Sequence, residues 1–119
     1  MWPINYTQEY EDWFSSQEEG NQMAINAKVI VLSEFGPNLG RPYVDTIKNS
    51  KYANLKELRV KNKNNVLRIL FCFDKRRNCW LLIGGNKKGK NKEQFYINLI
   101  RQAEKLIEKY PKIMEEKDV

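Results

Sequence analysis

The chain has 119 residues, a formal net charge of +6, two cysteines and no histidine. This length suits a single domain, and the absence of histidine excludes Ser-His or Cys-His catalysis and histidine-based metal sites. No window approaches the roughly 20 apolar residues that span a bilayer, and the first residues lack a secretory pattern, so we expect a cytoplasmic protein without membrane contact.

The N-terminal third predicts one short strand and two helices. Residues 2–6 are extended and contain a proline, which an edge strand tolerates. Thr7 can cap a first helix that runs to about Ser16. A second helix follows Gly20-Asn21 and ends at Phe35, before a glycine-proline stop signal.

The rest of the chain predicts a sheet followed by a helix. Residues 37–52 form a long loop, which we expect to pack against the body or to hold a short turn of helix at 44–48. Branched and aromatic runs bounded by polar turns then indicate an antiparallel meander, with strands at 54–60, 66–74 and 79–85. A last helix begins near Lys92 and ends at Pro111, and we expect a loose tail beyond it.

Pairing the strands from their turns places Arg59 opposite Arg68 and Arg68 opposite Gly85. Because side chains alternate between faces, one face collects an apolar core: Leu58, Val60, Leu67, Ile69, Phe71, Phe73, Trp80 and Leu82. The other face carries Leu70, Cys72, Leu81 and Ile83, and at one end Glu57, Arg59, Arg68, Gly85 and Lys87. We expect only that end to be exposed to solvent, with Gly85 leaving room above it. The two cysteines lie diagonally on neighbouring strands and are interpreted as reduced, packed thiols.

The charged residues at this solvent-exposed end of the sheet predict a phosphate site. Arginine binds phosphate oxygens bidentately and stays charged, so Arg59 and Arg68 can hold a scissile phosphate. Cleaving RNA needs in addition a base for the 2′-hydroxyl and an acid for the leaving 5′-oxygen. The candidates are Glu57 as base and Lys87 or Tyr96 as acid, and neighbouring positive charge should lower the pKa of Lys87. The simpler alternatives are a cross-strand ion pair for Glu57 and plain ring packing for Tyr96.

Positive charge is concentrated around this site. Residues 48–92 carry fourteen basic residues against two acidic ones, whereas both flanking segments carry an excess of acidic residues. Such a field attracts polyanions, nucleic acid above all. A solvated lysine-rich surface is the alternative, but it does not explain arginines inside apolar strands. Further candidates for RNA or phosphate binding are Lys56, Arg76, Arg77, Lys88 and Lys90, although strand parity turns Lys56 toward the core side.

Several stretches together resemble the phage-derived Gp49-like, HigB-type branch of the RelE/ParE toxin superfamily. The matching residues are LKELR at 55–59, Arg68 with Leu70-Phe71 behind it, LIGGNKKG at 82–89, Phe95-Tyr96 in the last helix, Trp13, the helix end at 34–37 and the loop at 39–42. Their order and spacing extend the resemblance over residues 6–110.

The resemblance implies the toxin of a type II toxin–antitoxin pair with an α+β, RelE-like fold. Its antiparallel sheet would combine a short N-terminal strand with the meander, with two N-terminal helices on one face and a C-terminal helix. Such toxins cut messenger RNA without metal or cofactor, typically on the ribosome, leaving a 2′,3′-cyclic phosphate. A cognate antitoxin, often a helix-turn-helix DNA-binding protein, silences them.

By resemblance, Arg59, Arg68 and Lys87 face the phosphate, Glu57 is the possible base, and Tyr96 stacks or donates a proton. Two other functions remain open from the sequence. Some members of the superfamily act on DNA gyrase, so a toxin that works by binding is one alternative. A nucleic-acid-binding module without catalysis is the other.

Overall fold

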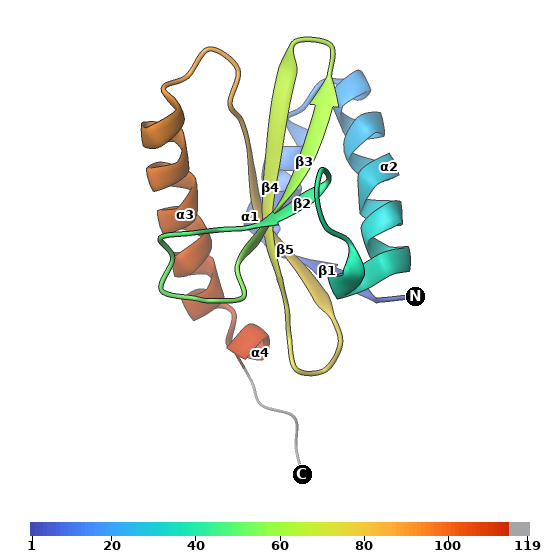
Figure 1. Cartoon of the computed structure of the whole chain (residues 1–119), viewed down its shortest axis with the longest axis vertical. Coiled ribbons are helices and arrows are strands. Elements are labelled where there is room, and N and C mark those ends of the chain that lie inside the picture. Colours follow the sequence, from blue (N-terminus) through green and yellow to red (C-terminus); the bar gives the residue numbers. More distant parts are fainter. Residues whose placement is uncertain (115–119) are drawn as a thin grey trace.

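The structure is a computed structural model that describes residues 1–114, and it has a five-stranded sheet between two layers of helix (Figure 1). In chain order the elements are β1 (Ile4–Tyr6), α1 (Gln8–Ser15), α2 (Glu19–Phe35), η1 (Gly36–Asn38), β2 (Val44–Thr46), β3 (Lys56–Asn62), β4 (Asn65–Phe73), β5 (Cys79–Asn86), α3 (Lys92–Lys109) and α4 (Pro111–Met114). The strand order across the sheet is β1-β5-β4-β3-β2. The predicted α+β class is confirmed.

The N-terminal elements follow the prediction closely. Thr7 caps α1, since its hydroxyl oxygen accepts a hydrogen bond from the Tyr10 amide at 3.0 Å. The same hydroxyl donates to the Leu82 carbonyl at 2.6 Å, which ties the start of α1 to β5. Helix α2 begins at Glu19, slightly before the predicted start, and ends at Phe35 as predicted.

The meander pairs in the predicted register, with Arg59 opposite Arg68 and Arg68 opposite Gly85. Two features of the sheet differ from the prediction. β1 runs parallel to β5, so the sheet is mixed rather than wholly antiparallel. Residues 44–46 form the edge strand β2 beside β3 instead of a helical turn, because this pairing lets Val44 bury its side chain opposite Leu58.

A β-bulge changes the faces of three side chains. Leu70 pairs with Ile83 but Phe71 pairs with Leu81, so Leu82 is an extra residue in β5. Beyond the bulge the alternation reverses, which makes the prediction wrong for three residues. Trp80 and Leu82 join the α3 side of the sheet, and Leu81 joins the side of α1 and α2.

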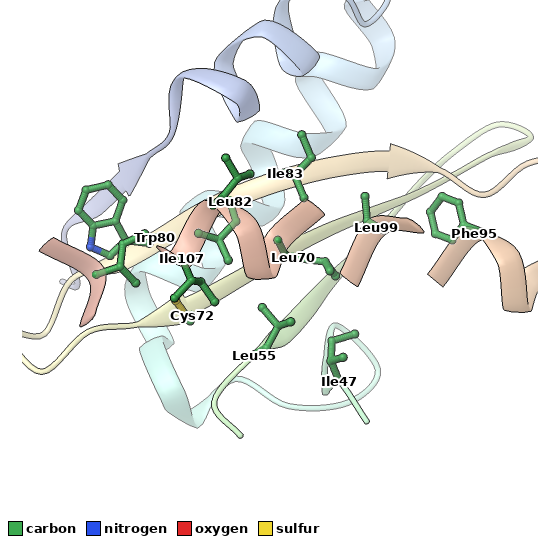
Figure 2. Packing of buried hydrophobic residues seen from close by; sticks show 13 residues of the cluster. Ile47, Leu55, Leu70, Cys72, Trp80, Leu82, Ile83, Phe95, Leu99 and Ile107 are labelled. Carbon is green, nitrogen blue, oxygen red and sulfur yellow. The ribbon is translucent and has the colours of Figure 1, made fainter. Parts of the chain in front are cut away.

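Both faces of the sheet are therefore buried over most of their length. On one face, Ile25 and Leu32 of α2 pack with Leu58 and Ile69. On the other, α3 covers residues from β4 and β5, and the close view in Figure 2 shows Leu70, Leu82, Leu99 and Ile107 spread along the layer between helix and sheet. This second cluster stops short of Arg68, and the polar end of the sheet borders a groove instead.

The two cysteines are free and buried on opposite faces of the sheet, Cys72 with the α3 cluster and Cys79 with the α2 cluster. Burial raises the pKa of the Cys72 thiol to about 12 and that of Cys79 further still. Thiols held so far from ionisation are poor nucleophiles, which supports their interpretation as packed, reduced side chains.

The sequence predicted a loose tail after Pro111, but the chain remains ordered for the next residues. Residues 111–114 form the helical turn α4, and Ile113 is buried against α3. The remainder of the predicted tail, residues 115–119, lies outside the described residues. Within residues 1–114, no helix is both long enough and apolar enough to cross a membrane.

Gly84 is required by packing. A β-carbon built at this position would overlap the indole ring of Trp13, which lies directly on the backbone of β5. We expect Gly84→Ala to lower the free energy of unfolding by about 1–3 kcal/mol, the usual cost of overpacking. Urea denaturation measures this change.

Gly40→Ala is the matched control, because nothing lies within 4 Å of a β-carbon at Gly40. We expect it to leave the stability almost unchanged. Equal stability losses in the two variants would contradict the packing role assigned to Gly84.

Candidate functional site

A groove of about 1050 Å³ lies at the polar end of the sheet, beside the N-terminal half of α3. Side chains from β3 and β4 form its floor, the N-terminal half of α3 forms one wall, and residues 45–49 form the other. All five predicted catalytic residues line it: Glu57, Arg59, Arg68, Lys87 and Tyr96. They come from four elements or loops, so tertiary folding brings them together.

Glu57 is the centre of the site. Only 6% of its side chain is exposed, and both of its carboxylate oxygens have partners. The Tyr96 hydroxyl donates to Oε1 at 2.7 Å, and Arg68 Nε lies 3.4 Å from the same oxygen. Arg59 donates to Oε2 at 3.2 Å through Nη2. A buried carboxylate that faces two guanidinium groups holds both in place.

Arg68 is the more enclosed of the two arginines. Its side chain is 13% exposed, and its Nε also donates to the Tyr96 hydroxyl oxygen at 3.2 Å. Nη1 donates to the Leu67 carbonyl at 3.0 Å, which fixes the plane of the guanidinium. Arg68 is therefore preorganised at the bottom of the groove.

Arg59 is more open and is shared between two carboxylates. Its side chain is 36% exposed, and Nη2 lies 3.3 Å from Asp45 on β2 as well as near Glu57. Asp45 also pairs with Arg41 at 3.0 Å, and that ion pair lowers the pKa of the Asp45 carboxyl. A phosphate entering the groove would compete with Asp45 for Arg59.

The environment shifts the pKa values of two groove residues in opposite directions. Burial, together with the positive charges of Arg68 and Lys92, lowers the pKa of Lys87 below the usual lysine value. The predicted direction is confirmed, although burial and not charge is the largest cause. Burial and the hydrogen bond to Glu57 raise the pKa of Tyr96, so its hydroxyl stays protonated. Lys87 Nζ lies 5.7 Å from the centre of the Tyr96 ring.

The sequence predicted an open space above Gly85, but the structure has none there. A β-carbon there would lie 3.0 Å from Phe95 and 3.4 Å from Leu99, so α3 already fills the region above it. The groove that could admit an anion is lined by Arg59 and Arg68 but not by Gly85, which lines the second groove. Gly85 allows α3 to approach β5 closely, and this approach brings Tyr96 within reach of Glu57.

The other predicted cations do not line the groove. Lys56 faces the α2 side of the sheet, with Nζ 5.7 Å from the centre of the Phe73 ring, as strand parity predicted. Arg76 and Arg77 lie on the β4–β5 turn at the far end of the sheet. Lys88 and Lys90 lie on the β5–α3 loop, and Lys90 lines a second groove on the other side of α3.

The groove also contains charged residues that the sequence interpretation missed: Asp45, Lys48, Lys92, Glu93, Arg101 and Glu104. Those on α3 could have been found from helical periodicity, since they lie on the same side of the helix as Tyr96. Asp45 and Lys48 carried no such signal, because only the pairing of β2 with β3 places them at the groove. Among residues 1–114, no three Cys, Asp or Glu side chains are placed to hold a metal ion.

Residues 12–108 match the model of a family described as phage-derived protein Gp49-like. The chain belongs to this family. The chain also resembles the putative toxin HigB3 of Mycobacterium tuberculosis, which is 37% identical over 100 residues, covering 84% of this chain and 85% of HigB3. Putative toxin HigB2 of the same organism is 37% identical over 95 residues, covering 79% of this chain but only 47% of HigB2.

The fold of this Gp49-like chain is that of RelE. It is similar to a chain in the crystal structure of an archaeal RelE–RelB complex from Pyrococcus horikoshii, with a TM-score of 0.54 and 12% identity, covering 76% of this chain and 98% of that chain. The family match and the HigB relatives make the protein a HigB-type member of the Gp49-like family, and the solved structure shows that its fold is RelE-like. The predicted family is confirmed.

Proposed function

We propose that this HigB-type toxin is a metal-independent endoribonuclease that cuts messenger RNA on the ribosome. The observation that supports this most directly is the convergence of Arg59, Arg68 and Tyr96 on the buried Glu57 at the floor of an open groove. RNA supplies its own nucleophile, the 2′-hydroxyl, so the protein has only to hold the phosphate and move two protons.

In this proposal the two arginines hold the scissile phosphate. They lie opposite each other on β3 and β4 and remain charged at all physiological pH values. As the 2′-oxygen attacks, negative charge grows on the non-bridging phosphate oxygens, and the fixed guanidinium groups stabilise it. Glu57 holds both guanidinium groups in fixed positions, so they do not have to reorient as this charge develops.

The general base is proposed to be a pair, Tyr96 backed by Glu57. Glu57 is too enclosed to meet the ribose, but the Tyr96 hydroxyl lines the groove and already donates to Glu57 Oε1 at 2.7 Å. The 2′-hydroxyl would give its proton to Tyr96 Oη while the tyrosine proton passes to Glu57. The O–P bond forms, and the bond to the 5′-oxygen breaks.

Lys87 is the proposed general acid that protonates the leaving 5′-oxygen. It must be protonated to act, so the cleavage rate should fall as pH rises through its pKa. Because Lys92 helps to lower that pKa, Lys92→Gln should move the alkaline fall in rate to higher pH. Single-turnover cleavage between about pH 7 and 10, corrected for hydrolysis without protein, measures this shift. A fall that stays at the same pH would exclude Lys87 as the acid.

The proposed function is tested by adding the purified protein to a cell-free translation reaction and mapping RNA ends. We expect cuts within translated codons that leave a 2′,3′-cyclic phosphate and a 5′-hydroxyl, and no cuts when initiation is blocked. Intact RNA with gyrase inhibition would instead identify a toxin that acts by binding. RNA binding without either effect would identify a non-catalytic module.

We also propose that a cognate antitoxin of the helix-turn-helix type binds this toxin. Support comes from family membership and from the RelE–RelB complex, in which a protein of the same fold is held by its partner. Co-expression of the reading frame adjoining this gene should restore growth to cells that express the toxin.

A further inference from the structure

Asp45 occupies an unfavourable position for an aspartate. It is the middle residue of the three-residue edge strand β2, and aspartate is among the residues that are depleted in strands. It also lies directly opposite Glu57 of β3, where two like charges repel each other. The side chain that β2 buries is that of Val44, so packing does not require a carboxylate at the next position. The stability of the strand therefore does not explain Asp45.

The two opposed carboxylates are compatible because the Arg59 guanidinium lies between them. Glu57 Oε2 accepts from Arg59 Nε at 3.4 Å and from Nη2 at 3.2 Å, and Asp45 Oδ2 accepts from Nη2 at 3.3 Å. The Glu57 side chain is 6% exposed and that of Asp45 is 23% exposed. Since water weakens an ion pair, Asp45 is the outer and weaker of the two partners.

Arg41 holds Asp45 from the other side. Its Nη2 lies 3.0 Å from Asp45 Oδ2, the same oxygen that accepts from Arg59. The bond from Arg41 is the largest cause of the lowered pKa of Asp45, so the carboxylate stays charged at neutral pH. Asp45 Oδ1 accepts from the Thr46 amide at 2.9 Å, which fixes the orientation of the carboxylate. Asp45 would thus keep two partners if Arg59 turned away.

Asp45 occupies the edge of Arg59 that a phosphate needs. Bidentate binding requires two N–H groups on one edge of the guanidinium. The edge formed by Nε and Nη2 faces Glu57. The other edge, formed by Nη1 and Nη2, is partly taken by Asp45, because Nη2 has only two hydrogens and Glu57 already accepts from this nitrogen. A phosphate that binds this edge therefore has to replace Asp45.

We propose that Asp45 is a built-in counter-anion of the groove, which the scissile phosphate replaces on Arg59 while Arg41 retains Asp45. No covalent bond changes in this exchange. Asp45 is a positioning residue, since it acts on the phosphate only through Arg59. The inference rests on the proposed function in taking RNA as the ligand. It adds that Asp45 and Arg41, which are not among the catalytic candidates, set how tightly the groove holds a phosphate.

Two substitutions should change RNA affinity in opposite directions. D45N keeps the side-chain shape and the oxygen that accepts from the Thr46 amide, but it removes the competing charge. We expect it to tighten RNA binding by about threefold to tenfold. R41Q leaves Asp45 with Arg59 as its remaining charged partner, so Asp45 competes more strongly, and we expect binding to weaken about threefold.

A double-mutant cycle separates this exchange from a general effect of charge. The proteins compared are the wild type, D45N, R41Q and R41Q/D45N. The probe is a 2′-O-methyl hexanucleotide, whose attacking hydroxyl is blocked, and fluorescence anisotropy at about 100 mM salt gives its affinity. In the D45N background R41Q should change affinity by less than about 1.5-fold, because Arg41 then has no carboxylate to hold at position 45. Thermal melting confirms that each variant folds.

E93Q is the matched control for D45N, because it removes one negative charge from the same groove. Glu93 is exposed in the first turn of α3 and lines the groove there. Its distance from the proposed exchange leaves only a screened, long-range effect on the phosphate. We expect E93Q to tighten binding by less than about twofold.

Equal gains in D45N and E93Q, or an equal loss from R41Q in both backgrounds, would show a general charge effect and overturn the proposal. Unchanged affinity in D45N would show that Asp45 does not compete with RNA, and would overturn it as well. If the affinities change as expected but the wild-type protein cuts no RNA, the proposed function fails and the counter-anion stands. If the protein cuts RNA and D45N binds like the wild type, only the counter-anion fails.

Discussion

Arg68→Ala should lower the rate constant for RNA cleavage by about 100- to 1,000-fold, the usual cost of removing one fixed group that stabilises charge in the transition state. Arg68 is 13% exposed and is held by Glu57, Tyr96 and the Leu67 carbonyl. Since its position is set before RNA binds, its effect should fall on the chemical step. Single-turnover cleavage at saturating RNA measures that step directly.

Arg101→Ala is the matched control. Arg101 lines the same groove from α3, whereas the polar partners of Glu57 in the described part of the chain are Arg59, Arg68 and Tyr96. We expect it to weaken RNA binding by roughly the tenfold that a contact of about 1.4 kcal/mol supplies, with little change in the rate at saturation. If Arg68→Ala behaves like Arg101→Ala, Arg68 serves only binding.

Arg68→Lys separates charge from geometry. Lysine keeps the positive charge but cannot present two parallel N–H groups to a phosphate. We therefore expect its rate to lie between those of wild type and Arg68→Ala. Denaturation curves for all three variants show whether lost packing contributes to the effect.

Tyr96→Phe should reduce cleavage by about 100-fold or more, within the range attributed to general acid–base groups. The substitution keeps the ring and its edge-to-face contact with Phe95, whose centre is 5.3 Å away, but removes the hydroxyl that donates to Glu57. A role in stacking would survive this change, whereas a role in proton transfer would not. Rates at saturating RNA distinguish the two.

Tyr52→Phe controls for the loss of a hydrogen bond as such. The Tyr52 hydroxyl donates to Glu108 at 2.9 Å, outside the groove. This variant should cut RNA at the wild-type rate. A Tyr96→Phe variant that also cuts at that rate would exclude Tyr96 from the base and overturn the proposed Tyr96–Glu57 pair.

The amino-acid sequence by itself determined the meander and the pairing of its two arginines. Polar turns of defined length set the register of β3 with β4, and strand alternation then placed Arg59 and Arg68 on one face. Helix caps and stop signals likewise determined α1 and the end of α2, because these are local interactions. Several of the family motifs, among them LKELR at 55–59, lie in these same segments.

The tertiary structure decided how the site is enclosed. No turn or alternation pattern in the sequence predicts the bulge at Leu82, which places Trp80 and Leu81 on the faces opposite to those predicted. The edge strand β2 exists only because β3 offers it a partner, and it brings Asp45 to Arg59. The approach of α3 over Gly85 converts a predicted open space into a wall that carries Tyr96 to Glu57. The bulge, the edge strand and the position of α3 all depend on contacts between different segments of the chain. Such contacts leave no periodic signal in the sequence.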